Sequence, residues 1–339
     1  MIGPNPLRAQ VHRFSAFDSC DLRSAEFRGR PRYAERKLAS GDTHMMITRV
    51  ALILGTTLMT LPGESAVVSR ADELRMVSSS NHAAEQYMNQ GAYQEARQLY
   101  LRSLPVMEKL LGPEDPASIT TMANLCVASS HLRAFVDAKP VCARALALRE
   151  KVLGPDHLDV ARSLSDLGIL YSTEGDFGRA ASLFRRALGI AGSHPDSIIM
   201  PGLLNNLGFL YFQKRKYAVS EGFFARAVAA VEKDRGPEDP DLVTVLSNLG
   251  TVYLGNHQAR AAEQCFRRAL AIAEGPSGRD QTSSVRALVG LARAEAAQGK
   301  RSEAETFLHR AEAVASPGGS GYLEWSASLE AARSALLHK

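Results

Sequence analysis

A row of polar side chains recurs along the chain at nearly constant spacing. Asn124, Asp166, Asn206 and Asn248 follow one another at intervals of 42, 40 and 42 residues. Because each carboxamide carries both a donor and an acceptor, amides held in register can hydrogen-bond the backbone of an extended peptide. The same amides could instead satisfy the ends of neighbouring helices. The sequence leaves these two roles open.

Further residues adjoin this row and extend the predicted surface. The amide of Asn205 lies beside the row in sequence, and the rings of Phe209 and Phe212 would provide apolar surface next to it. The predicted partner-binding residues are therefore Asn124, Asp166, Asn205, Asn206, Phe209, Phe212 and Asn248.

The sequence contains no motif typical of a catalytic or metal site. It has no Gly-rich phosphate loop of the Walker type, no His-Glu-x-x-His, no Gly-x-Ser-x-Gly and no Cys-x-x-Cys. Its histidines are scattered, and most fall at predicted turns or helix ends. We therefore predict that the protein is not an enzyme and that it uses no metal or cofactor.

The charge balance argues against a nucleic-acid partner. Lys and Arg number 40 against 36 Asp and Glu; residues 1–44 hold 8 and 5 of these, which leaves 32 and 31 for residues 45–339. This nearly neutral remainder lacks the basic face that nucleic acids require. We expect a protein or peptide partner instead.

The polar row belongs to a longer repeat that organises most of the chain. Gly250 has equivalents at Ala84, Cys126, Gly168, Gly208 and Ala292, at steps of about 42 residues. The same kinds of side chain recur 3, 12, 16 and 19 residues after each of these reference positions, for example at Tyr253, Ala262, Phe266 and Ala269 in the fifth copy. Spacings of three, four and seven predict helices, and turn residues between them predict two antiparallel helices in each copy. We predict an all-α fold in which small residues mark helix crossings and aromatic residues fill the gap to the next repeat.

This pattern resembles the tetratricopeptide repeat. The stretch "LGTVY…ARAAEQCFRRA" within residues 245–274 follows its "L-G-x-x-Y … A-x-x-x-F-x-x-A" signature, and six such copies span about residues 76–315. The resemblance implies a right-handed α-solenoid of about six helix pairs. The 42-residue period and the "LGPEDP" and "RGPEDP" connectors are similar to the kinesin light chain subtype of the family. In these connectors we expect Gly112, Gly154 and Gly236 to end helices, and Asp115 and Asp239 to cap the next ones.

The resemblance also implies where a partner would bind. In such solenoids the first helix of each pair lines the concave face, and the kinesin light chain-like repeats use an Asn of this row for peptide backbone. Some family members clamp a partner's C-terminal carboxylate with Lys and Arg. Here the only candidates for a clamp are Arg162, Arg286 and Arg293, which we place in different repeats, so we expect binding of an internal extended segment.

Cys126 and Cys142 occupy the small slot of the first helix and the aromatic slot of the second helix within one repeat, and should face each other. In an oxidising compartment they could form a disulfide. They could instead be reduced core residues that serve as small apolar side chains, and we favour this second interpretation.

The two ends of the chain differ from the repeats. Residues 45–66 contain an apolar run over 50–61, too short to span a membrane and similar to a signal peptide, behind a leader of residues 1–44 that we interpret as an upstream extension. The run could instead be a packing helix or a membrane anchor. We assign residues 67–315 to the solenoid and residues 316–339 to a linker and a capping helix.

We therefore predict an exported, periplasmic or secreted, non-enzymatic scaffold that binds an extended segment of another protein. The alternatives are a self-associating structural module, and a cytoplasmic or membrane-anchored scaffold if the signal peptide is not used.

Overall fold

The computed structural model describes residues 69–194, 197–275, 281–315, 329–330 and 332–334. The predicted leader, signal peptide and linker lie outside these residues. Within them the chain is helical and contains no strand, so the predicted all-α class is confirmed. The helices fall into two compact units that divide near Leu153, and each is described separately.

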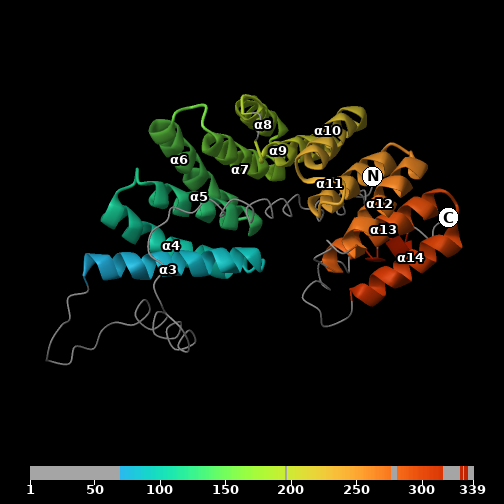
Figure 1. The fold of residues 1–339 in the computed structure, drawn as a ribbon, viewed down its shortest axis with the longest axis horizontal. Coiled ribbons are helices and arrows are strands. Elements are labelled where there is room, and N and C mark those ends of the chain that lie inside the picture. Colours follow the sequence, from blue (N-terminus) through green and yellow to red (C-terminus); the bar gives the residue numbers. More distant parts are fainter. Residues whose placement is uncertain (1–68, 195–196, 276–280, 316–328, 331, 335–339) are drawn as a thin grey trace, which may run out of the picture. The chain divides into compact units, whose positions relative to one another are not determined.

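The first unit holds two antiparallel helix pairs, the first and second repeats (Figure 1). Their helices are α3 (Arg70–Asn89), α4 (Tyr93–Leu111), α5 (Pro116–His131) and α6 (Phe135–Leu153). In the core of this unit, Tyr100 and Leu125 pack with small residues of α3, α4 and α5. Met122 of α5 and Ala145 of α6 belong to the adjoining cluster.

The second unit holds the third to sixth repeats, and consecutive helices pack on one another (Figure 1). Its helices are α7 (Leu158–Glu174), α8 (Phe177–Gly192), α9 (Met200–Gln213), α10 (Tyr217–Arg235), α11 (Asp241–Gly255), α12 (Ala259–Glu274), α13 (Gln281–Ala297) and α14 (Arg301–Val314). Beyond α14, Leu329 and Ala332 are buried against the core of the last repeats, where the sequence predicts a cap.

The turn inside each pair is left-handed at one fixed position. Glycine occupies it in three repeats, at Gly91, Gly175 and Gly299. Residues with side chains occupy it in the others, where Arg133, Arg215 and His257 have φ of 56°, 56° and 60°. An L-residue in this conformation costs about 1–2 kcal/mol, so the short turn imposes its backbone geometry whether or not glycine is present.

The connectors between pairs end one helix and cap the next, as predicted. Gly112 and Gly236 follow α4 and α10 with φ of 98° and 96°. Asp115 accepts a hydrogen bond from the backbone N–H of Ala117 at 2.8 Å, with Pro116 opening the helix. Asp239 accepts the equivalent bond from Asp241 at 3.0 Å. Because Asp and Pro satisfy or remove free N–H groups of the first turn, these two connectors start α5 and α11 at a fixed residue.

Small residues mark the closest helix crossings, but the aromatic residues do more than fill the gap to the next repeat. A Cβ built on Gly168 would lie 2.7 Å from the ring of Phe184, 16 residues later in the same repeat. The ring of Phe266 lies equally close to Gly250 of its own repeat and also against Gly290 of the next. The rings therefore pack on the glycine of their own pair, and Phe266 packs on the next repeat as well, which corrects the predicted division of roles.

Ion pairs join the second helices of successive repeats at equivalent positions. Glu108 pairs with Arg144 at 2.9 Å, and 124 residues later Glu232 pairs with Arg268 at 2.6 Å. Glu274 of α12 pairs with Arg310 of α14 at 2.8 Å. These partly exposed pairs contribute about 0–1 kcal/mol each to stability. They therefore help to align successive repeats more than they stabilise the stack of repeats.

Candidate protein-binding face on the first helices

The predicted polar row lies on the first helix of each pair, where its amides bond to the preceding first helix. Asn206 on α9 donates from Nδ2 to Oγ of Ser165 on α7 at 3.2 Å. Asn248 on α11 donates from Nδ2 to Oδ1 of Asn205 on α9 at 2.9 Å. Both bonds follow one rule. The donor lies two residues before the reference glycine of its own repeat, and the acceptor lies three residues before the reference glycine of the preceding repeat. We call Asn205, Asn206 and Asn248 the amide row.

The first unit also has an amide bond between its first helices, but at other repeat positions and with the donor on the preceding helix. Asn81 on α3 donates from Nδ2 to Oγ1 of Thr121 on α5 at 2.7 Å. Asn124, the predicted site residue on α5, is buried with 8% of its surface exposed. Asp166 is half-buried on α7 of the second unit. The structure therefore brings together the three amides of the second unit, while Asn124 belongs to the other unit.

Burial limits what the amide row offers to a partner. Asn205 and Asn206 are only 4% and 5% exposed, whereas Asn248 is half-buried. The Oδ1 atom of Asn206 is buried and accepts no hydrogen bond from the part of the chain that the structure describes. The Nδ2 group of Asn206 donates between helices, whereas its Oδ1 atom remains an unused acceptor. Contact with a peptide stays a prediction for all three residues.

The two predicted aromatic residues contribute to the core between α9 and α11. Phe209 and Phe212 are partly buried against a cluster that includes Leu249 and Val252. The ring of Phe212 lies 5.9 Å from that of Tyr217, in a tilted arrangement. Only the half-exposed part of each ring remains for a partner.

The three arginines considered for a carboxylate clamp are not all in different repeats. Arg286 and Arg293 both lie on α13, seven residues apart and therefore on one face of that helix. Arg162 lies on α7, where its Nη1 is 3.5 Å from Oδ1 of Asp159. Burial lowers the pKa of Arg293 from its usual value. The prediction that these residues are spread over three repeats was wrong.

Sequence reasoning missed a buried carboxylate in the last two repeats. Glu295 on α13 is 0% exposed, and its two oxygens lie 2.8 Å from Arg267 and 2.9 Å from Lys300. Its place in the repeat is the one that holds Tyr253 in the preceding copy, and this exchange of a ring for a carboxylate is the signal that could have revealed it. Because two cations satisfy both oxygens, the group serves to connect helices rather than to bind a ligand.

A second carboxylate completes this network. Glu263 accepts hydrogen bonds from Gln298 at 2.8 Å and from Arg267 at 2.7 Å. These bonds, with the Gln298 bond the largest cause, lower the pKa of Glu263 to about 2, against the opposing effect of its partial burial. The network therefore ties α12 to α13 and to the start of α14 through charge-assisted bonds.

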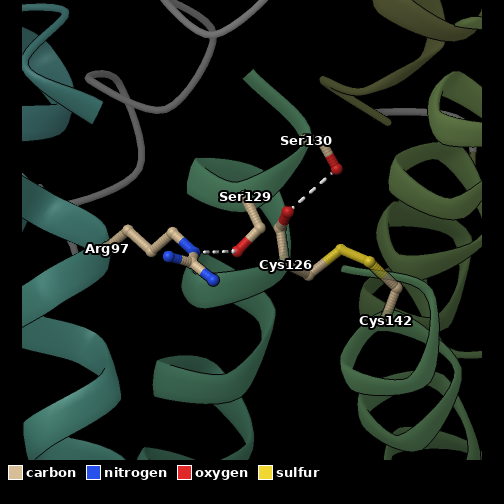
Figure 2. The surroundings of a disulfide bond; sticks show 5 residues. All are labelled: Arg97, Cys126, Ser129, Ser130 and Cys142. Atoms are coloured by element: carbon tan, nitrogen blue, oxygen red, sulfur yellow. Dashed lines mark hydrogen bonds between the residues drawn. A yellow bond between two sulfur atoms is a disulfide. The ribbon is translucent and has the colours of Figure 1, made fainter. Parts of the chain in front are cut away.

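Cys126 and Cys142 form a disulfide between α5 and α6 (Figure 2). Their Cα atoms are 5.1 Å apart, and both residues are 2% exposed. The structure therefore holds the pairing that the repeat positions allowed, and not the two reduced cysteines that we favoured from the sequence. Cys265 is a free, half-buried thiol whose pKa burial raises to about 11.

Sequence-family models agree with this architecture. A model described as tetratricopeptide repeat matches residues 125–193 and 200–275, and a second model of the same description matches residues 78–117. The chain belongs to the tetratricopeptide repeat family. Tetratricopeptide repeats serve in general as scaffolds for protein–protein interaction, and this chain has the fold of such a scaffold. A search of curated proteins gives no match.

Solved structures show the same fold. BtubC (BKLC) from P. vanneervenii is 21% identical, with a TM-score of 0.55 over 71% of this chain and 90% of its own. A putative kinesin light chain from Podosopora anserina is 21% identical over 70% of this chain and 94% of its own, with a TM-score of 0.37. The Rap conjugation gene regulator of plasmid pLS20, in complex with the Phr* peptide, is 14% identical with a TM-score of 0.60, covering 88% and 87%. BtubC and the Rap regulator, whose TM-scores exceed 0.5, therefore share the fold of this chain.

None of the described helices combines the length with the apolar composition that a membrane span requires. No group of three or more His, Cys, Asp or Glu side chains in the described ranges is arranged to hold a metal ion.

Proposed function

We propose that this protein is an exported, non-catalytic scaffold that binds an extended segment of a partner protein along α7, α9 and α11. One observation carries the proposal: the buried Oδ1 of Asn206 has no donor in the described part of the chain. Leaving a buried acceptor unpaired costs about 1–3 kcal/mol. Because this oxygen is buried in the free chain, a backbone N–H from a partner would reach it only after the Asn206 side chain turns outward, and the new bond would then recover this cost.

The neighbouring residues suit an uncharged, extended segment. Asn248 is half-buried and bonds Asn205, the chain neighbour of Asn206, and the partly exposed ring of Phe209 adds apolar surface on the same helix as Asn206. An extended strand presents alternating N–H and C=O groups, which amides can bond and aromatic rings can flank. We therefore expect an internal segment with apolar side chains rather than a free C-terminal carboxylate. The Rap regulator, which has the same fold and was solved with a bound peptide, supports this choice of ligand class.

The proposed export rests on different residues. The apolar run at residues 50–61 has the length of a signal-peptide core, and the disulfide between Cys126 and Cys142 suits an oxidising compartment. Edman sequencing of the native protein tests this part. We expect a start between Ser65 and Val67 in the periplasm or medium, whereas an intact N-terminus in the cytoplasm would refute export and leave the binding proposal standing.

The binding proposal is tested with a displayed library of extended peptides, selected on the full chain and measured by isothermal titration calorimetry. Replacing both amides, Asn206→Ala with Asn248→Ala, should weaken a selected peptide by more than tenfold, because about 1–2 kcal/mol is lost for each peptide hydrogen bond. Gln264→Ala, an exposed amide on the second helix α12, is the matched control and should leave affinity unchanged.

Two checks keep the result interpretable. Circular dichroism must show unchanged helicity in the double variant, because Asn248 also bonds Asn205. Equal affinity of the double variant and the wild type for the peptide would refute binding at Asn206 and Asn248. Light scattering over a range of concentrations separates the alternative, a self-associating module, which would show a mass that rises with concentration in the absence of any peptide.

A further inference from the structure

The reference position and the residue 16 places later face each other in every repeat, and most pairs combine a small with a large side chain. In three repeats the pair is a glycine beneath a phenylalanine ring: a Cβ on Gly168, Gly208 or Gly250 would lie 2.7, 2.8 and 2.8 Å from the nearest ring atom. The first and last repeats pair alanine with Tyr100 and Leu308, which are 0% and 4% exposed. Five of the six pairs thus bury a large side chain between their two helices.

The second repeat departs from this rule. Its pair is Cys126 and Cys142, so neither side of the crossing supplies a ring or a branched aliphatic chain. This helix crossing is as well shielded from solvent as those of the other repeats, since both cysteines are 2% exposed. The nearby polar contacts do not join α5 to α6: Arg97 of α4 donates to Ser129 at 3.2 Å, and Ser130 donates to the carbonyl of Cys126 at 2.8 Å (Figure 2). Without a large side chain, the disulfide is the only direct connection between the two paired positions.

We propose that the disulfide between Cys126 and Cys142 takes the place of the large side chain that closes the other repeats, so that oxidation completes the α5–α6 pair. Burial of a Phe-sized side chain stabilises by about 1.5–3 kcal/mol. A disulfide that closes a short loop stabilises by a similar amount, about 2–4 kcal/mol. The covalent bond can therefore replace the missing contact.

The chemistry requires an oxidant of the disulfide class. A thiolate of the pair attacks the disulfide of a thiol–disulfide oxidoreductase, and the second thiolate then displaces the oxidoreductase from the mixed disulfide. Two protein thiols lose two electrons and two protons, and the oxidoreductase leaves as a dithiol. Because both sulfur-bearing residues are buried once the pair is closed, oxidation must occur while α5 and α6 are still separated. The second repeat is therefore completed during folding and in contact with the oxidant.

Hydrogen exchange of the full chain, followed by mass spectrometry with and without a phosphine reductant, tests this proposal. Cys20→Ser and Cys265→Ala remove the other thiols, so that alkylation and intact mass report the pair alone. On reduction we expect amides of α5 and α6 to exchange roughly a hundredfold faster, which corresponds to the loss of a typical disulfide. Amides of α11 and α12 serve as the internal reference and should keep their rates.

The repeats themselves supply the decisive control variant. Cys126→Gly with Cys142→Phe copies the pair found in the third, fourth and fifth repeats, and should protect α5 and α6 whether or not reductant is present. Cys126→Ala with Cys142→Ala removes both the bond and the volume, and should exchange as fast as the reduced wild type under all conditions.

Either of two results would overturn the proposal. One is an equal exchange rate for the oxidised and the reduced wild type in α5 and α6. The other is a Gly–Phe variant that folds, as judged by the reference helices, but leaves α5 and α6 as unprotected as the Ala–Ala variant. The proposal does not depend on the peptide-binding function, and neither result would bear on that function.

Discussion

The ring of Phe266 is held between two glycines, and replacing one of them should destabilise the last two repeats sharply. A Cβ on Gly290 would lie 2.3 Å from Cε1 of the ring, and a Cβ on Gly250 would lie 2.8 Å from its Cζ atom. Carbon atoms prefer a separation of about 3.5–4.0 Å, so the ring would have to move by more than about 1 Å. It is 1% exposed and cannot retreat from one glycine without approaching the other.

The size of the effect follows from two opposed contributions. Alanine is favoured over glycine inside a helix by about 1 kcal/mol, whereas overpacking a core costs about 1–3 kcal/mol and sometimes more. Because the approach at Gly290 is the closest of any glycine described, we expect the upper part of that range and a net loss of about 2 kcal/mol for Gly290→Ala. Gly222→Ala on the exposed face of α10, where an added Cβ meets nothing within 4 Å, should instead gain up to about 1 kcal/mol.

The assay is urea unfolding followed by circular dichroism, with hydrogen exchange of α12 and α13 to localise the change. A second substitution, Phe266→Leu, shortens the side chain that the added methyl group would strike and should recover part of the loss in a double-mutant cycle. The reasoning fails if Gly290→Ala proves as stable as the wild type, or if it loses stability by the same amount with and without Phe266→Leu.

Three further predictions concern single side chains. Arg215→Gly should raise the melting temperature, because Arg215 has φ of 56° and glycine would relieve about 1 kcal/mol of left-handed strain; a lower melting temperature by calorimetry would contradict this. The folded-state pKa of Glu263, about 2, lies below its unfolded value of about 4.3, so its contribution is complete above the latter and disappears as the pH falls towards 2. Glu263→Gln should therefore flatten the loss of stability between about pH 4.3 and 2 in acid titrations followed by circular dichroism, and an unchanged slope would exclude this role. Burial, followed by the charge and hydrogen bond of Glu221, raises the pKa of Tyr253 to about 12, so ultraviolet titration should show a late phenol that is lost in Tyr253→Phe and moves to lower pH in Glu221→Gln.

The sequence predicts the fold well because each repeat must satisfy the same packing geometry. The recurrence around Gly250 and Phe266 reflects a steric requirement, in which a ring can lie on a helix only where the helix has no side chain. The caps at Asp115 and Asp239 were equally predictable, since satisfying the first N–H groups of a helix is a local matter. Such short-range constraints leave a periodic trace in the sequence.

The candidate site was less predictable because its bonds depend on which neighbour each side chain meets. Asn206 and Asn248 occupy equivalent positions, yet one bonds Ser165 and the other bonds Asn205, because the preceding repeats offer different partners. The closeness of Glu295 to both Arg267 and Lys300 likewise requires the packing of three helices at once. A pattern along one helix contains no record of these contacts.

The positions at which one repeat differs from the others are therefore the informative ones. A slot that keeps its residue type in most repeats is explained by packing, so a departure such as Cys126 with Cys142, or Glu295 in place of a tyrosine, needs a local cause. The first departure replaces nonpolar packing by a link that depends on oxidation, and the second replaces a tyrosine by a carboxylate that pairs with Arg267 and Lys300. Because repeats in a solenoid contact only their neighbours, each link acts on one part of the array without altering the rest. The amide row lies on other helices, α9 and α11, whose closing pairs are glycine and phenylalanine, and so its geometry should be insensitive to both redox state and mild acid.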